Sequence, residues 1–446
     1  MHYVIIGGDA AGMSAAMEIF RNDSTAEITT LEKGNIYSYG QCGLPYVVGK
    51  KIFSTTDVIA RSVEMFRTKY KIDAKIGHEV TDVNPLNKTV AGNVLVTGER
   101  FEVKYDRLLV ATGASSIVPD WEGTQLDGIH TFKTIPQTEA LIAELKDVNH
   151  VTIIGGGYIG LELAENIREI GKEVRIIQRG DRLMPILDPE MADILQQKAK
   201  EKHVEVKLNE EVKSFTGNTR VQEVVTDKGT YSTDLVLIAI GIKPATNFLK
   251  ETGIETLANG AIIVNEYLET SIPDIYAAGD CATHFNRLKQ KNDYIPLGTT
   301  ANKQGRLAGF NMIGEKIPFK GIVGTSIMKF FELSIGRTGL SEEEVKELDI
   351  PFDTSTIEAS DIAGYYPGKE LMQIKLLYRK EDQLLLGGQI VGGHGVDKRT
   401  DVLATALYHG MTLPDLLDLD LSYAPPFNGV WDPLQQRAKR NFDKNK

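Results

Sequence analysis

One pattern occurs twice in this chain and constrains its fold more than any other feature. Residues 4–12 read as an apolar strand, a glycine-rich turn and the start of a helix, and residues 151–160 repeat that succession. Glycines in such a turn let the backbone approach a pyrophosphate, which the positive end of the following helix attracts. Two copies therefore predict two dinucleotide-binding units. The turns supply Gly7, Gly8, Ala10, Ala11 and Gly12 in the first copy, and Gly155, Gly157 and Gly160 in the second.

The two copies differ in ways that bear on their ligands. Asp9 stands where the first turn would usually carry its second glycine. Glu32 ends the next strand, about 20 residues after Gly12, where a carboxylate can accept both hydroxyls of an adenosine ribose. The second copy has Gln178 and Arg179 at that place. Gln does not repel a 2′-phosphate and Arg attracts it, which favours NADPH, whereas an Arg stacked on adenine would also permit NADH.

The bulk properties exclude several classes of protein. The chain has 446 residues, enough for two or three domains, and 42% of them are hydrophobic. It holds no run of about 18 apolar residues, so no membrane span is expected, and the first strand follows no secretory signal. The net charge of -11 argues against nucleic acid as a partner. Two cysteines cannot form a disulfide framework, and a free thiol suits a reducing cytoplasm.

Cys42 is the candidate reactive residue. It lies in the polar, glycine-containing segment 37–46, an unusual setting for an inert core thiol. The other cysteine, Cys281, follows an apolar segment and is interpreted as a core residue. A redox thiol without an internal partner must pair with a sulfur from outside, or cycle through a sulfenic acid. Cys42 therefore indicates a substrate that carries reactive sulfur or peroxide oxygen.

Two further apolar strands end in residues suited to a nucleotide site. The first ends where a crossing between two nucleotide domains is expected, and the second ends in an acid that can accept from a ribitol or lie beside a pyrophosphate. From residue 324 no nucleotide turn occurs, which predicts a third, α+β domain. The strand-end residues are Ala111, Thr112 and Gly113 in the first case, and Gly279 and Asp280 in the second.

Together these motifs resemble the pyridine nucleotide-disulfide oxidoreductases, and most closely their single-cysteine branch of coenzyme A-disulfide reductases. The resemblance covers essentially the whole chain and implies an α/β fold with two Rossmann-like domains, for FAD and NAD(P)H, plus a C-terminal α+β dimerisation domain. The motifs that carry it are residues 7–12, 38–46, 111–113, 155–160, 278–280 and 423–426. The implied domains are 1–113 and 244–323 for FAD, 114–243 for NAD(P)H and 324–446 for dimerisation.

The resemblance also implies a mechanism. Cys42 attacks coenzyme A disulfide, releases one coenzyme A and forms the mixed disulfide Cys42-S-S-CoA, which NAD(P)H then cleaves by way of the flavin. In this branch the partner subunit of a homodimer contributes tyrosines, which map to Tyr423 and to Tyr365 or its neighbour Tyr366. Further implied cofactor contacts are Lys33 for FAD and Glu162 for NAD(P)H. No metal is implied.

Coenzyme A carries a 3′-phosphate and a pyrophosphate, so its site needs basic and polar groups. A local cationic cluster at 61–71 is one candidate, although each lysine in it is equally well explained as a solvated side chain. The cluster consists of Arg61, Arg67, Lys69 and Lys71. The other contacts that the resemblance implies are Ser14, Glu18, Arg21, Ser38, Gln41, Asn302 and Trp431.

Three other functions stay open. A persulfide or polysulfide reductase would use the same thiol. NADH oxidases and peroxidases of this branch carry a histidine where this chain has Ala10, and alanine cannot donate a proton to a peroxide oxygen. A flavin-binding redox sensor without turnover is the non-enzymatic alternative.

Overall fold

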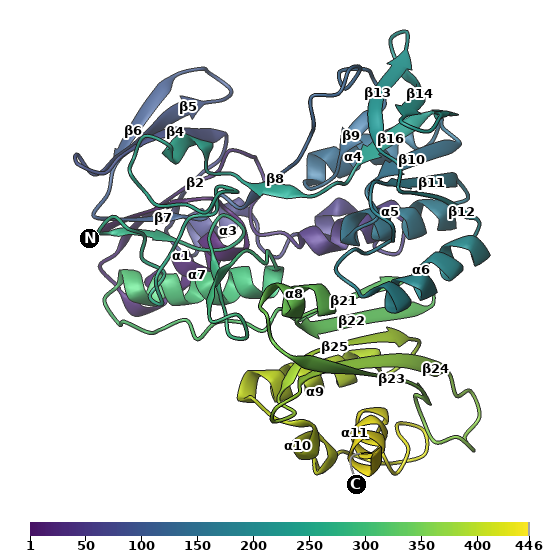
Figure 1. Cartoon of the computed structure of the whole chain (residues 1–446). Helices are drawn as coiled ribbons and strands as arrows, with labels where there is room; N and C mark the ends of the chain where they lie inside the picture. Colours follow the sequence, from purple (N-terminus) through teal and green to yellow (C-terminus); the bar gives the residue numbers. More distant parts are fainter. Residues whose placement is uncertain (445–446) are drawn as a thin grey trace.

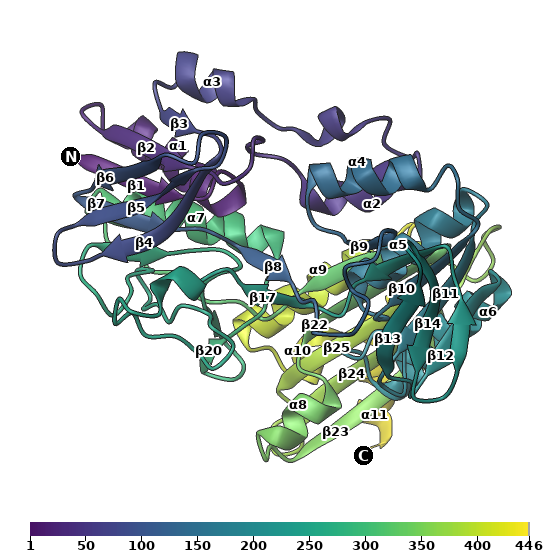
Figure 2. The same cartoon turned by 90° about the horizontal axis from the view of Figure 1, so that it is seen from above.

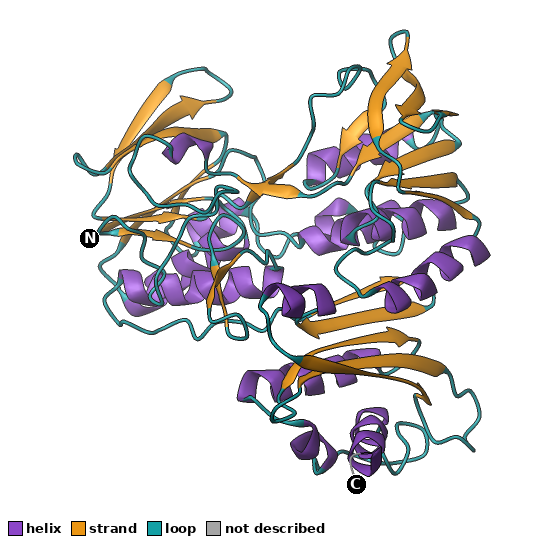
Figure 3. Ribbon diagram, viewed as in Figure 1, coloured by secondary structure: helices purple, strands orange, loops and turns teal. Residues whose placement is uncertain are grey.

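The computed structural model describes residues 1–444 and contains three bodies, each built around a five-stranded sheet (Figure 1). Two of these sheets are parallel and flanked by helices, and the third is antiparallel (Figure 3). The predicted fold class, α/β with an added C-terminal α+β domain, is confirmed. No helix among the described residues is long and apolar enough to span a bilayer.

The first parallel sheet has the strand order β18-β7-β1-β2-β3. Its central strand β1 is almost wholly buried, because a parallel sheet is covered on both faces. Helices α1 and α7 pack against each other on one of these faces, where a Cβ at Gly305 would lie 2.2 Å from the Ala11 carbonyl oxygen. The elements are β1 His2–Ile6, α1 Ala10–Asn22, β2 Glu27–Leu31, β3 Asp73–Lys75, β7 Arg107–Val110, β18 Ile275–Ala277 and α7 Gly298–Met312.

Smaller elements surround this sheet. A three-stranded antiparallel meander, β4-β5-β6, lies beside it, and helix α2 extends toward the second body, where it packs against α4 and α5 (Figure 2). These elements are η1 Gln41–Gly43, α2 Leu44–Val48, η2 Thr55–Val58, α3 Val63–Thr68, β4 His78–Asn84, β5 Thr89–Val94, β6 Arg100–Lys104, η3 Asn247–Leu249, β19 His284–Asn286 and β20 Lys291–Asp293.

The second parallel sheet repeats the first, with the order β12-β11-β10-β16-β9. A short antiparallel pair, β8 with β17, carries the chain into this body and back out of it (Figure 2). Its elements are β8 Ala114–Ser116, β9 Ile129–Thr131, α4 Ile135–Glu144, β10 His150–Ile154, α5 Tyr158–Glu169, β11 Glu173–Gln178, α6 Pro189–Glu201, β12 Val204–Leu208, β13 Val212–Gly217, β14 Val221–Thr226, β15 Thr230–Ser232, β16 Leu235–Ile238 and β17 Ile242–Pro244.

The C-terminal body has the antiparallel order β21-β22-β25-β24-β23, with α9 packed on β22 and β25. The polar C-terminal stretch forms helix α11 as far as Lys444, anchored by buried Leu434 and Ala438. Residues 445–446 lie outside the described part. The elements are β21 Ser326–Phe330, β22 Leu333–Gly339, α8 Glu342–Glu347, β23 Phe352–Ser360, β24 Leu371–Arg379, β25 Leu385–Gly392, α9 Val396–His409, α10 Leu413–Leu417 and α11 Pro433–Lys444.

The sheets follow the segments that the sequence assigned to separate domains. Strand β18 returns to the sheet that β1 begins, so the first body is built from two stretches of chain separated by the second body. The boundaries at 113, 243 and 323 themselves stay a prediction.

Candidate active site around Cys42

Both glycine-rich turns are held by the same close backbone contacts. Gly7 has a φ of +117°, and a Cβ there would lie 2.2 Å from the Ala111 carbonyl oxygen. Gly155 has a φ of +106°, and a Cβ there would lie 2.4 Å from the Ala239 carbonyl oxygen. Any other residue at either place would be strained and would collide with the neighbouring strand. Both turns thus leave bare backbone at a helix N-terminus, as a pyrophosphate requires.

The side chains at the ends of the second strands, Glu32 just after β2 and Gln178 as the last residue of β11, occupy equivalent positions in the two units. The Glu32 carboxylate accepts hydrogen bonds from the N–H groups of Gly8 (2.8 Å) and Gly34 (2.6 Å). Gln178 Oε1 accepts one from Gly156 N–H (2.9 Å). A carboxylate can accept more than two hydrogen bonds, so Glu32 keeps capacity for ribose hydroxyls. Arg179 is exposed beside Gln178, and its side chain has no partner among the described residues.

The carboxyl ends of β7 and β18 complete the first nucleotide site. Gly279 has a φ of +82°, and Asp280 follows it with a carboxylate that makes no hydrogen bond to the described residues. Burial raises the pKa of Asp280, and the charge of Lys133 opposes that rise. The bare turns, Glu32 and this unpaired carboxylate fit FAD. Lys33, also predicted to contact FAD, forms an ion pair with Glu79 at 2.6 Å.

Cys42 lies in the short helix η1, in the segment between β2 and β3 of the first unit, and its side chain is exposed. Its surroundings raise the pKa of the thiol by desolvation and by the charges of Glu162 and Asp280, while Lys133 lowers it. Cys281 is fully buried, and its Sγ donates to the Val110 carbonyl oxygen at 3.3 Å. Cys42 is therefore the accessible thiol of the two.

Glu162 connects this thiol to the second nucleotide unit. It lies on α5, the helix that follows the second glycine-rich turn. Desolvation, together with the neighbouring charge of Glu165, raises the pKa of Glu162 to about 7. Because the charge of Glu162 acts on the Cys42 thiol, the two nucleotide units converge on Cys42.

Hydrogen bonds link the side chains of Asp9, Gln41 and Lys133, an arrangement that the sequence did not indicate. Asp9 precedes α1, and its carboxylate accepts from Gln41 Nε2 at 2.7 Å and from the N–H of Tyr39 at 3.2 Å. Lys133 Nζ donates to Gln41 Oε1 at 3.1 Å. Sequence reasoning missed Lys133 because a single lysine before a helix matches no motif.

The two candidate tyrosines lie together in the C-terminal body. The hydroxyls of Tyr365 and Tyr423 are 2.9 Å apart, and Tyr365 is 74% exposed while the neighbouring Tyr366 is 40% exposed. Their segments follow β23 and α10, far from α2 in the same chain (Figures 1 and 2). One chain alone therefore does not bring these tyrosines to Cys42.

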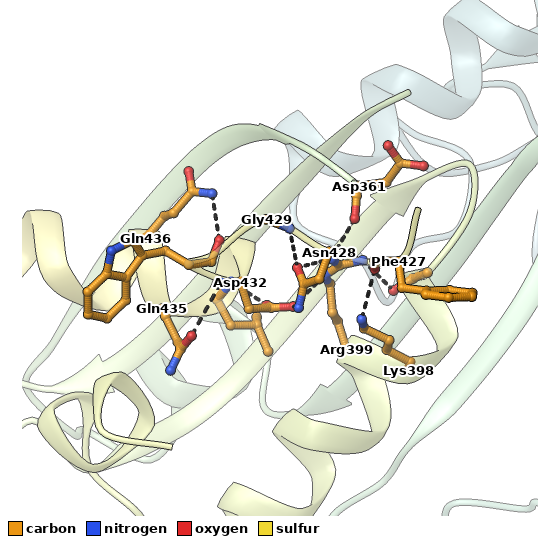
Figure 4. Close-up of polar contacts among 12 residues, drawn as sticks. Asp361, Lys398, Arg399, Phe427, Asn428, Gly429, Asp432, Gln435 and Gln436 are labelled. Carbon is orange, nitrogen blue, oxygen red and sulfur yellow. Dashed lines mark hydrogen bonds and ion pairs between the residues drawn. The ribbon is translucent and has the colours of Figure 1, made fainter. Parts of the chain in front are cut away.

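A buried network holds the two tyrosine segments together (Figure 4). Arg399 donates to the carbonyl oxygen of Asp361 at 2.8 Å, to Asn428 Oδ1 at 3.0 Å and to Asp432 Oδ2 at 3.1 Å. Asp361 lies in the first segment, and Asn428 lies in the second. Arg399 and Asp432 are both almost fully buried, so this ion pair fixes the segments rather than contacting solvent.

The predicted coenzyme A contacts fall into separate groups. Ser14 Oγ donates to Asn302 Oδ1 at 3.0 Å, and Glu18 pairs with Arg21 at 2.9 Å, so one face of α1 and α7 carries four of them. Arg306, which the sequence did not single out, lies 3.6 Å from Glu18. The cationic cluster is on and around α3, and Trp431 is in the C-terminal body. Ser38 has a φ of +51° next to the Cys42 loop. No metal-binding group of side chains occurs in the described residues.

Comparison with family models matches residues 1–305 to the pyridine nucleotide-disulphide oxidoreductases and residues 325–434 to the dimerisation domain of the same family. The NAD(P)H coenzyme A polysulfide/persulfide reductase of Pyrococcus horikoshii is 39% identical over 97% of this chain and 96% of its own length. The NADH oxidase of Enterococcus faecalis is 33% identical over 98% of this chain and 99% of its own length. The crystal structure of reduced CoADR-RHD of Bacillus anthracis superposes with a TM-score of 0.96 at 34% identity, covering 99% of this chain and 80% of that one.

Proposed function

Because this chain belongs to the pyridine nucleotide-disulphide oxidoreductases, we propose that it reduces coenzyme A disulfide to two coenzyme A thiols through Cys42. It is an NAD(P)H-dependent flavoprotein oxidoreductase that acts on sulfur–sulfur bonds. The observation that carries the proposal is a single accessible thiol where two nucleotide units converge, while the other cysteine is buried. Such a thiol has no internal disulfide partner, and a sulfur of the substrate can take that place.

FAD, when bound, accepts a hydride from NAD(P)H and passes the electron pair to sulfur. The residues of the first unit would hold it: the turn that Gly7 begins would receive the pyrophosphate, Glu32 would bind the ribose, and Asp280 at the carboxyl end of β18 would complete the site. The second unit would hold the nicotinamide nucleotide. There Gln178 in place of an acid, with the exposed Arg179 beside it, supports NADPH as the preferred donor.

Cys42 carries the covalent step. Its thiolate attacks one sulfur of coenzyme A disulfide, so that the Cys42-S-S-CoA bond forms and one coenzyme A leaves as a thiolate. The leaving thiolate takes up a proton, and two electrons from NAD(P)H later cleave the mixed disulfide and release the second coenzyme A. Tyr423 and Tyr365 of the partner subunit are the proposed proton donors, since a phenol is a fair acid toward a thiolate.

The proposed mechanism requires a dimer, because within one chain the two tyrosines lie far from Cys42. The match of residues 325–434 to a dimerisation domain supports it. Exposed aromatic side chains gather in the same C-terminal segments, as expected of a surface that a second subunit covers. They are Tyr365, Tyr366, Tyr423, Phe427 and Trp431.

Polar and cationic groups near the first unit supply coenzyme A recognition. The exposed cluster around α3 suits the 3′-phosphate, and the polar face shared by α1 and α7 suits the pantetheine amides. Arg306 on α7 adds a cation to that face.

A persulfide or polysulfide reductase is the second candidate. The 39% identity to a coenzyme A polysulfide/persulfide reductase favours it, and the same thiolate chemistry serves both substrates. Peroxide or oxygen reduction is less well supported, because Ala10 offers no proton donor over Cys42.

Mass spectrometry of the purified, unreduced protein tests the proposal directly. We expect a coenzyme A adduct on Cys42, and a Cys42→Ser enzyme that retains FAD but does not turn over coenzyme A disulfide. Full turnover by Cys42→Ser would refute the mechanism. Rates on coenzyme A disulfide and coenzyme A persulfide, measured side by side, decide between the two candidates.

A further inference from the structure

We propose that Lys133 is a positioning residue that stabilises the Cys42 thiolate, and that Asp9 and Gln41 hold Lys133 in place. The inference rests on the proposed function only in taking Cys42 as the nucleophile. It assigns a use to Asp9, the one departure from the expected glycine pattern in the first nucleotide turn.

The chemistry of Asp9 fixes the orientation of Gln41. An ionised carboxylate only accepts hydrogen bonds, so the amide of Gln41 must turn its NH2 group toward Asp9, at 2.7 Å. The carbonyl oxygen of Gln41 then faces the other way, where Lys133 Nζ donates to it at 3.1 Å. A glycine at position 9 would leave both the amide and the lysine without this orientation.

Gln41 also connects Lys133 to Cys42, because Gln41 is the neighbour of Cys42 along the backbone. Gln41 and Cys42 are consecutive residues of the same helical turn, η1. Lys133 comes from the other nucleotide unit, between β9 and α4, so the hydrogen bond crosses from one unit to the other. Lys133 is half-buried, so solvent screens its charge less than it would screen a lysine in bulk water. Its charge therefore acts more strongly on neighbouring groups.

Lys133 opposes the other charges that act on Cys42. Glu162 on α5 and Asp280 after β18 both disfavour the thiolate, as does desolvation. Lys133 acts in the opposite direction on Cys42, and also on Asp280 and Asp9. Lys133 thus offsets part of the rise in the pKa of the thiol, and its removal would lower the thiolate fraction further; the thiolate is the more nucleophilic form.

The fold disfavours the charged form of Asp9. Desolvation raises the pKa of Asp9 to about 6, against the hydrogen bonds from Gln41 and Tyr39. Asp9 is a half-buried carboxylate whose charge opposes stability, and its hydrogen bond leads to Gln41, the neighbour of the nucleophile. Such a local conflict is expected at a functional site.

The test is the pH dependence of Cys42 alkylation by iodoacetamide in the FAD-loaded protein, followed by peptide mapping. Lys133→Met should raise the pH midpoint by about one unit, which reduces the rate at pH 7 about tenfold. Gln41→Leu should shift it in the same direction by less, and Lys133→Arg should retain most of the parent rate. Lys50→Met, an exposed lysine near Cys42 in sequence, is the matched control and should match the parent.

An unchanged midpoint in Lys133→Met, with FAD content equal to the parent, would overturn the proposal. Equal shifts in Lys133→Met and Lys50→Met would also overturn it, because the effect would then be one of general charge. Alkylation requires no coenzyme A, so this outcome is independent of whether coenzyme A disulfide is the substrate.

Discussion

Lys375 Nζ lies 2.8 Å from Asp188 Oδ2, and this contact joins the C-terminal body to the second nucleotide unit with both side chains buried. Lys375 is 0% exposed, and it also contacts Glu190 and Glu342 at 2.5 Å. Burial opposes its charge, but the hydrogen bonds to the carboxylates outweigh that effect and raise its pKa. One lysine therefore neutralises carboxylates from two bodies.

Lys375→Met should destabilise the protein by about 3 kcal/mol or more, because the carboxylates left behind keep their charge without a partner. Thermal unfolding of the FAD-loaded protein measures the loss. Lys380→Met is the control, since Lys380 and Asp353 form an exposed pair at 3.4 Å worth about 0–1 kcal/mol. Equal effects of the two substitutions would contradict this account.

The choice of nicotinamide nucleotide should depend on Arg179. Because its guanidinium is exposed beside Gln178 and has no partner in the described part of the chain, Arg179→Ala should lower kcat/KM for NADPH about 10- to 100-fold and leave NADH nearly unchanged. Gln178→Glu should act in the same direction by repelling the 2′-phosphate. Arg182→Ala is the control, since Arg182 already pairs with Asp181 at 3.1 Å. A parallel loss with both nucleotides would place Arg179 at the adenine instead.

Proton delivery to the leaving thiolate should depend on Tyr423. Tyr423→Phe removes the hydroxyl that lies 2.9 Å from that of Tyr365, and general acids contribute about 100-fold or more to rate. We expect a fall of that order in kcat for coenzyme A disulfide, with the rate of Cys42 alkylation unaffected. Tyr366→Phe should change kcat little, because no hydrogen bond of the Tyr366 hydroxyl occurs in the described residues. An unchanged kcat in Tyr423→Phe would remove this tyrosine from the mechanism.

The fold was predictable because its signals are local. A strand, a glycine turn and a helix follow one another within a few residues at Gly7 and again at Gly155, and the close contacts of those glycines with Ala111 and Ala239 are what the motif implies. The formation of helix α11 was not foreseen, since its anchor residues, Leu434 and Ala438, are few and stand in a polar stretch.

The candidate site was predictable only in part. Cys42 was singled out by its neighbours in the sequence. The contact from Asp9 through Gln41 to Lys133 joins residues distant in the chain, and no spacing rule connects them. No spacing rule points to Arg399 either. Its buried side chain donates to Asp361 and to Asn428 and so holds the two tyrosine segments side by side. Such contacts follow from tertiary packing, which a single sequence does not display.

The contribution of Asp9 to the free energy of unfolding should decrease as the pH rises. Its pKa rises from 3.8 to about 6 in the fold, mainly through desolvation, so the protonated form is the one the fold favours. The favourable contribution is complete below pH 3.8 and is lost as the pH rises through about 6. Asp9→Asn removes the charge, so it should stabilise the protein by about 1–2 kcal/mol at pH 8 and by little at pH 4.

Thermal unfolding of the parent protein and Asp9→Asn across this pH range measures the difference. Asp23→Asn is a control of opposite sign, because hydrogen bonds from Thr25 lower the pKa of Asp23, so its loss should reduce stability at pH 8. The gain in Asp9→Asn should come with slower Cys42 alkylation, since a neutral amide at position 9 no longer forces Gln41 to face Lys133 with its oxygen. A variant that is less stable than the parent at pH 8 would show that the Asp9 carboxylate supports the fold rather than the chemistry of Cys42.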